Sequence, residues 1–138
     1  AFVGHDYPGA PQINLKTIDE TPFQIGDIPF IPIRAIHKTL PVLGFRIHDF
    51  TYITDANFIA DVELEKIKGS KVLVLNALRK EPHYSHFNLE QAIEIVCRTQ
   101  PEKAYFTHIS HHLGLYDVVM KELPGSMELA YDGLQIVM

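Results

Sequence analysis

The sequence has one cysteine, no long apolar run and few basic side chains. Cys97 alone excludes a disulfide within the chain and is typical of a reducing compartment, so we expect a cytoplasmic location. No stretch approaches the roughly 18 apolar residues of a membrane span, and no basic-then-apolar segment predicts a secretory signal. The net charge of −5 argues against a general nucleic-acid binder, which neutralises phosphates with Lys and Arg. We therefore expect neither a membrane nor a nucleic acid as partner.

Three motifs of other enzyme classes are also absent. The sequence has no GxSxG nucleophile turn, no GxxxxGK[ST] phosphate loop and no GxGxxG dinucleotide fingerprint. Cys97 falls inside a predicted helix, distant in sequence from any histidine, so we expect a small core residue rather than a nucleophile. Serine hydrolases, P-loop nucleotide hydrolases and dinucleotide enzymes are therefore set aside.

The remaining pattern is typical of one α/β domain with a single core, since the 138 residues are 46% hydrophobic. Asn88 with Gln91 predicts a capping box, Asp61 a helix cap, and Asp132-Gly133 a tight hairpin turn. In chain order we predict a loop over 1–12, strands over 13–18, 30–36, 42–47 and 50–53, a helix over 60–68, a strand over 71–75, a helix over 88–98, a strand over 104–107, a helix over 113–123, and a closing hairpin of 127–131 with 134–138.

Four polar side chains follow predicted strands. His37, Asp55 and His108 come directly after or shortly after a strand, and His86 lies in the loop after 71–75. In α/β sheets, loops beyond the carboxyl ends of strands bring distant residues together. Imidazole nitrogen and carboxylate oxygen suit zinc or manganese. Each residue alone also fits a hydrogen-bonded structural role, and Asp55 also fits a turn, so the spacing predicts a metal site without excluding these readings.

Four segments, taken together and in this order, resemble the metallo-β-lactamase superfamily. The branch is that of the phosphonate-pathway cyclic phosphodiesterase and, more distantly, ribonuclease Z. The segments are Pro32–His37 with Pro41–Arg46, Tyr52–Asp55, Val72–Arg79 running into Pro82–His86, and Phe106–His111; the closing Ala130–Gly133 is similar too.

The resemblance implies a metal-dependent hydrolase, most simply a phosphodiesterase that acts on a small molecule with a hydroxide shared by two divalent metals, zinc or manganese. By position, His37, Asp55 and His108 match metal ligands of the family. His86 matches a histidine that binds no metal and stands beside the scissile phosphate. The other histidines of these segments have no counterpart among the ligands: His83, His111 and His112.

The resemblance also implies an α/β fold, namely the second half of an αββα sandwich, with a mixed sheet and helices packed on one face. The family's first metal-binding cluster, HxHxDH, is absent, and no His-x-His occurs. We therefore expect residues 1–138 to be the C-terminal portion of a single domain whose N-terminal portion lies outside this chain. Alone, the chain is expected to be inactive, and its partner would be that N-terminal half or another copy of the chain, as in a homo-oligomer.

Two alternatives stay open. One is a catalytically inactive half-domain that serves as a binding or assembly module. The other is a ribonuclease Z-like enzyme that processes RNA, although the acidic balance disfavours it.

Overall fold

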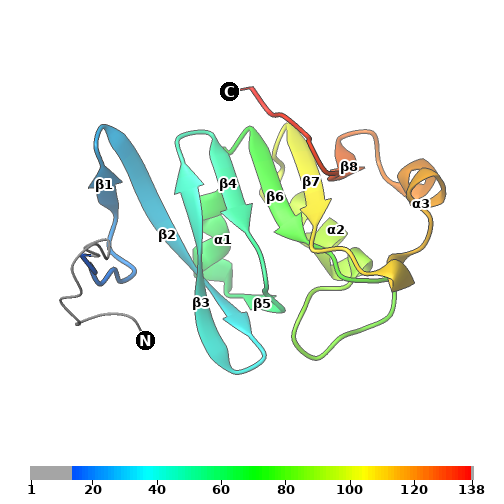
Figure 1. Ribbon diagram of the computed structural model, residues 1–138, viewed down its shortest axis with the longest axis horizontal. Coiled ribbons are helices and arrows are strands. Elements are labelled where there is room, and N and C mark those ends of the chain that lie inside the picture. Colours follow the sequence, from blue (N-terminus) through cyan, green and yellow to red (C-terminus); the bar gives the residue numbers. More distant parts are fainter. Residues whose placement is uncertain (1–13, 138) are drawn as a thin grey trace, which may run out of the picture.

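The computed structural model describes residues 14–137, which form a mixed sheet of eight strands with helices behind it (Figure 1). The predicted loop 1–12, Ile13 and Met138 lie outside the described residues. The elements are β1 (Phe23–Ile25), β2 (Ile28–His37), β3 (Leu40–Ile47), β4 (Phe50–Ile53), β5 (Phe58–Ile59), α1 (Asp61–Ile67), β6 (Val72–Asn76), α2 (Leu89–Thr99), β7 (Lys103–Thr107), a 3₁₀ turn (His111–Leu113), α3 (Tyr116–Glu122) and β8 (Met127–Leu129).

The strand order is β1-β2-β3-β4-β6-β7-β8, with β5 paired to β2. Neighbours from β1 to β4 are antiparallel, whereas β4, β6, β7 and β8 are parallel to one another. Two antiparallel steps separate β2 from β4, so β2, β4, β6 and β7 all run in the same direction. Their carboxyl ends therefore meet at one edge of the sheet, which is the lower edge in Figure 1.

One face of the sheet forms the core. Ile33, Ile53, Leu75 and Phe106 are fully buried on this face, beneath helices α1 and α2. The central strand β6 has the sequence VLVLN and is buried at all five positions. Helix α2 lies against it with an apolar stripe, and its first turn is closed by the predicted capping box between Asn88 and Gln91. The hairpin of β3 and β4 around His48-Asp49 is also confirmed.

Several local predictions are wrong. Residues 14–18 form no strand, and the N-cap of α1 is Ala60, without a side-chain hydrogen bond, rather than Asp61. Cys97 is exposed because it lies beside the apolar stripe of α2 rather than within it.

The C-terminal region also departs from prediction. The expected helix over 113–123 is divided, because Gly114 adopts a φ of +116° between the 3₁₀ turn and α3. The closing hairpin does not form: β8 pairs in parallel with β7, and residues 134–137 are not a strand. Of the helices in residues 14–137, none is long and apolar enough to cross a membrane.

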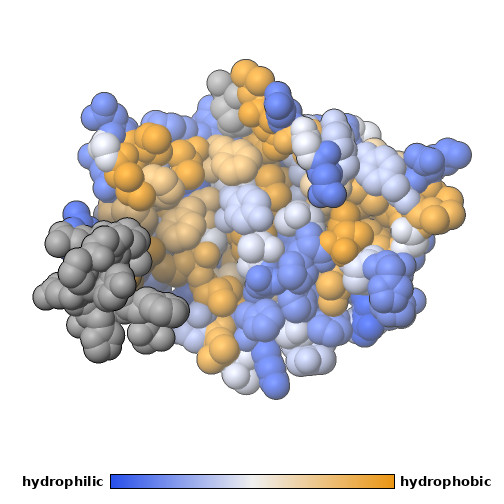
Figure 2. Space-filling view, viewed as in Figure 1, coloured by the Kyte–Doolittle hydropathy of each residue, from blue (hydrophilic) through white to orange (hydrophobic). Residues whose placement is uncertain are grey.

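The opposite face of the sheet carries aromatic side chains that no described helix covers. Phe23, Phe30 and Phe45 form a cluster with ring centroids 5.2–6.1 Å apart, and Tyr52 on β4 is 43% exposed. The register pairs Phe45 with Tyr52, which places both on this face. Figure 2 views the molecule from this side and shows apolar side chains gathered over β1 to β4. We call this surface, with Phe23, Phe30, Phe45 and Tyr52, the open sheet face.

Candidate metal centre

The four predicted site residues lie at the carboxyl edge of the sheet. His37 is the last residue of β2, Asp55 follows β4 by two residues, and His108 follows β7 directly. His86 is in the long loop between β6 and α2. The parallel direction of the four strands brings these residues together from positions up to 71 residues apart (108 − 37).

The Asp55 carboxylate lies between two of the imidazoles. Its Oδ1 is 3.1 Å from Nε2 of His86 and 3.1 Å from Nε2 of His108. The two rings stack with centroids 4.7 Å apart and an angle of 14° between their planes. The ligand atoms of these three residues all lie within 4.8 Å of one another.

His37 lies beside this group but is not one of its three members. Its ring packs edge-on against that of His86, with centroids 4.9 Å apart. His86, which the sequence prediction leaves outside the metal ligands, thus lies in direct contact with Asp55. His37 contacts the group through the ring of His86. Which of the four side chains bind metal stays a prediction.

The backbone at two of these residues is strained. Asp55 has a φ of +54° and His108 a φ of +56°, a left-handed conformation that is uncommon outside glycine. Such conformations cost about 1–3 kcal/mol each and are kept only where the surroundings hold them. Lys38, His48 and Gln100 adopt the same conformation, so it sets the direction of these loops without itself marking a site.

Asn76 holds the Asp55 loop in this conformation. It is the last residue of β6, fully buried, and its amide both accepts from the Ala56 N–H and donates to the Ala56 C=O, each at 2.9 Å. The Ala56 C=O also accepts from the Phe87 N–H, which ties the loop of His86 to that of Asp55. The sequence prediction missed Asn76. Its only signal was a polar residue that ends an otherwise apolar strand.

The second nitrogen of His86 faces polar groups of its own loop. Its Nδ1 is 2.9 Å from the hydroxyl of buried Ser85 and 3.2 Å from Nδ1 of His83. Burial lowers the pKa of His86, and the neighbouring imidazoles of His108 and His37 lower it further, whereas the hydrogen bond with Asp55 raises it. His86 is therefore held by partners on both sides of its ring.

The remaining histidines of the C-terminal region stand apart from Asp55. His111 and His112 are exposed on the 3₁₀ turn, where their rings pack on each other with centroids 3.9 Å apart. Neither belongs to the group of ligand atoms around Asp55.

The donor set around Asp55 fits a divalent metal. Two donors bound at about 2.1 Å to one ion lie roughly 3.0–3.4 Å apart, which is close to the two 3.1 Å separations observed here. One carboxylate oxygen with imidazole nitrogens is a donor set that zinc and manganese both accept. Three donors can hold one ion with an open position, whereas a pair of ions needs further ligands.

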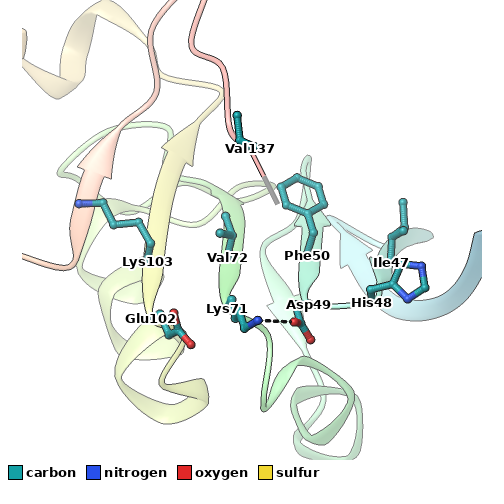
Figure 3. A pocket seen from close by; sticks show the side chains of 9 residues that line it. All are labelled: Ile47, His48, Asp49, Phe50, Lys71, Val72, Glu102, Lys103 and Val137. Carbon is teal, nitrogen blue, oxygen red and sulfur yellow. Dashed lines mark ion pairs between the residues drawn. The ribbon is translucent and has the colours of Figure 1, made fainter.

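A pocket of about 600 Å³ lies at the other edge of the sheet, around the β3–β4 turn and the first residues of β6 and β7 (Figure 3). Lys71 and Asp49, which both line this pocket, form an ion pair at 2.9 Å. None of the four predicted site residues lines this pocket. The four predicted site residues lie instead at the carboxyl edge.

Comparison with known proteins identifies the family. Residues 2–109 match the family described as the β-lactamase superfamily domain. A diphosphatase of the PhnP family is similar in structure over 92% of this chain and 50% of its own, with a TM-score of 0.89 and 31% sequence identity. The metallo-β-lactamase fold protein YhfI from Bacillus subtilis, at 18% identity, covers 89% of this chain and 55% of its own with a TM-score of 0.75.

Two further relatives extend the comparison. The short form of human tRNase Z shares the fold at 14% identity and a TM-score of 0.62, over 81% of this chain and 44% of its own. An octanoyltransferase from Porphyromonas gingivalis is 34% identical over 138 residues, which are 99% of this chain and 28% of that protein. The chain thus spans about half the length of the diphosphatase and less than a third of the octanoyltransferase. On the evidence of the family match, the mixed sheet and these structural relatives, the chain belongs to the β-lactamase superfamily and forms half of a metallo-β-lactamase fold.

Proposed function

We propose that the protein containing this chain is a metal-dependent hydrolase that cleaves phosphodiesters of small molecules. The observation that carries the proposal is the Asp55 carboxylate oxygen at 3.1 Å from the Nε2 atoms of both His86 and His108, at the carboxyl edge of the sheet. The structural relative with 31% identity is a diphosphatase, and this supports hydrolysis of phosphorus–oxygen bonds. The net charge of −5 favours a small substrate over RNA.

The proposed ligands follow the resemblance: they are His37, Asp55 and His108, and the metal pair would be zinc or manganese. His86 Nε2 is as close to Asp55 Oδ1 as His108 Nε2 is, at 3.1 Å, but we assign it a different role. When bound, the metals would supply hydroxide at neutral pH and neutralise charge on the phosphoryl oxygens. Asp55 would help to hold the metals through its carboxylate. The left-handed backbone at Asp55 and the Asn76 hydrogen bonds to Ala56 hold that carboxylate toward the histidines.

His86 is proposed as the proton-transfer group. Its Nε2 faces the centre of the cluster, where it would protonate the leaving oxygen of the substrate. Its Nδ1 is fixed by Ser85 and His83, which orient the ring. A positioned acid of this kind accelerates a reaction about 10²–10⁴-fold.

We further propose that an N-terminal half, or a second copy of the chain, completes the site. The open sheet face offers an apolar surface for such a partner, and the three proposed ligands His37, Asp55 and His108 are too few for two ions. Octanoyl transfer is not carried over, because this chain matches 28% of the protein that bears that name. A cytoplasmic location remains a prediction from the single cysteine.

The test compares the protein made from the full reading frame with the 138-residue chain. Metal content would be measured by mass spectrometry, and turnover with bis(p-nitrophenyl) phosphate. We expect the protein from the full reading frame (the long form) to bind two metals and to hydrolyse the substrate. We expect the 138-residue chain to show no metal and no turnover. A long form without metal or turnover would overturn the hydrolase and leave the binding or assembly module as the better explanation.

A further inference from the structure

A second cavity shares His108 with the candidate metal centre. It measures about 230 Å³. Its lining consists of Thr107, His108, Ile109, Ala130, Tyr131 and Asp132. The first three of these follow or end β7, and the last three follow β8, so the cavity lies at the same edge of the sheet as Asp55.

Hydrogen bonds of the backbone hold the walls of this cavity. The Ala130 N–H donates to the Phe106 C=O at 2.8 Å, which continues the pairing of β7 and β8 past the end of β8. The Leu134 N–H donates to the Tyr131 C=O at 3.1 Å and closes a turn in which Gly133 has a φ of +88°. Asp132 is therefore presented from a defined turn.

The lining is suited to accept hydrogen bonds. The Asp132 carboxylate, the Tyr131 phenol and the Thr107 hydroxyl all carry acceptor oxygens, and none of the six lining residues is Lys or Arg. Within residues 14–137, the Asp132 carboxylate forms no ion pair. A carboxylate without a cation repels phosphate and attracts hydroxyl or ammonium donors.

We propose that this cavity binds the alcohol portion of a phosphodiester substrate through hydroxyl or ammonium groups that donate hydrogen bonds to Asp132. The inference rests on the proposed hydrolase, in which the phosphate lies at the metal centre on the other side of His108. The cavity would make the enzyme prefer phosphodiesters of polar alcohols over those of apolar alcohols. Asp132 is exposed, so a substrate donor would gain one hydrogen bond to a solvated carboxylate, and analogues without the donor would lose the modest free energy of that bond.

The test uses the full-length, metal-loaded protein and three p-nitrophenyl phosphodiesters. Their second alcohols are n-propanol, glycerol and ethanolamine, which have similar size and differ in donors. We expect kcat/KM to be about 3- to 10-fold higher for at least one polar ester than for the propyl ester, the effect of an ordinary hydrogen bond, because Asp132 is exposed. Asp132→Asn should lower this ratio toward 1, since Asn keeps the turn but loses the charge.

Glu94→Gln is the matched control. It removes the same charge from an exposed position on α2, outside the cavity, and should keep both the ratio and the rate. Metal content and thermal midpoint would be checked for each variant.

The outcomes separate the two proposals. A preference for the glycerol ester identifies hydroxyl groups as the ligand, and a preference for the ethanolamine ester identifies ammonium. Equal kcat/KM for all three esters, or a ratio that Asp132→Asn leaves unchanged, overturns the assignment of the cavity while the hydrolase stands. No turnover of any ester, nor of bis(p-nitrophenyl) phosphate, overturns the hydrolase and this inference with it.

Discussion

At the scale of the residue, Asp55 connects the two imidazoles of the candidate centre. One carboxylate oxygen is 3.1 Å from each of two Nε2 atoms, and the side chain is about half exposed. A carboxylate in this position can accept a hydrogen bond from each imidazole and also has oxygens that can bind a metal ion.

The first prediction concerns Asp55→Ala in the full-length protein. We expect it to lose metal and activity together, because the carboxylate is a proposed metal ligand. Metal content and bis(p-nitrophenyl) phosphate turnover measure both effects. Asp27→Ala, at an exposed turn between β1 and β2, is the control and should change neither. Activity that survives without Asp55 would contradict its role as a ligand.

The second prediction separates His86 from His37. His86→Ala should keep the metals but lose about 10²–10⁴-fold in rate, as expected for a proton-transfer group. His37→Ala should lose metal. The same metal analysis decides this, with exposed His112→Ala as a histidine control. Metal loss in His86→Ala with retention in His37→Ala would exchange the two roles, which the closeness of His86 to Asp55 makes a sharp test.

The candidate ligands could be predicted from the sequence, whereas the hydrogen bonds that hold their loops in place could not. His37, Asp55 and His108 stand next to strands that periodicity reveals, and parallel strands bring their ends to one edge. Asn76 also ends a strand, but its role depends on two hydrogen bonds to Ala56, 20 residues away. No local pattern encodes such a tertiary contact.

At the scale of the element, the sheet is close-packed where β3 crosses the core. A Cβ on Gly44 would lie 2.5 Å from Cγ1 of Ile53 and 2.9 Å from the backbone oxygen of Tyr52. Real Cβ atoms do not approach other atoms so closely, so β3 and β4 would have to separate. This glycine thus sets the spacing of the hairpin whose second strand leads to Asp55.

The third prediction is that Gly44→Ala destabilises the protein by about 1–3 kcal/mol, the usual cost of an overpacked core. Chemical unfolding measures the loss. Gly125→Ala is the control, because a Cβ there meets no atom within 4 Å and the glycine has no left-handed φ, so its free energy of unfolding should barely change. Equal stability of the two variants would show that the hairpin adjusts freely.

The β3–β4 turn is joined to β6 by a charged pair. The Asp49 carboxylate lies 2.9 Å from the Lys71 ammonium, and the Asp49 C=O accepts from the N–H groups of Lys71 and Val72. The hydrogen bond and the charge of Lys71 hold the pKa of Asp49 below its usual value. The native pKa is thus lower than the unfolded one, so the pair stabilises the fold above about pH 4 and loses this effect as the pH falls through the native pKa.

The fourth prediction follows from the lowered pKa of Asp49. Lys71→Met should lower the thermal midpoint at pH 7, and its difference from the parent should shrink as the pH is taken below about 4. The effect should be small, because both groups are exposed. Lys121→Met on α3, which forms no ion pair among the described residues, should show no such dependence. Parallel curves for parent and Lys71→Met would contradict the role of the pair.

Elements with strong local signals were predictable, and those that depend on a partner strand were not. Helix α2 carries its own capping box and apolar stripe, and both are present. The Asp132-Gly133 turn forms, yet residues 134–137 are not a strand, and the partner of β8 is β7, far earlier in the chain. A turn signal specifies the reversal of the chain but not the neighbour that each arm will find.

At the scale of the molecule, the two faces of the sheet are unequal. One is sealed by α1 and α2, whereas the open sheet face presents aromatic rings of β1, β2, β3 and β4 (Figure 2). Rings that lie 5–6 Å apart on a flat sheet are suited to pack against a second sheet. We therefore propose that this surface is a contact site for a partner.

The fifth prediction is that the isolated 138-residue chain self-associates through the open sheet face. Phe45→Glu and Tyr52→Glu should each reduce association, because a carboxylate there opposes burial of the rings. Val62→Glu is the control: Val62 is 69% exposed on α1, on the helical side, and its replacement should leave association unchanged. Sedimentation velocity over a range of concentrations gives the mass directly.

In the full-length protein, we expect the same three variants to differ in stability rather than in self-association. If a first half covers this face, Phe45→Glu and Tyr52→Glu should destabilise the long form by burying a charge at the contact, whereas Val62→Glu should not. A short chain that stays monomeric at high concentration, together with a long form indifferent to all three variants, would mean that the aromatic face is not a contact surface. In that case the ligands missing from this chain would have to come from a different side of the sheet.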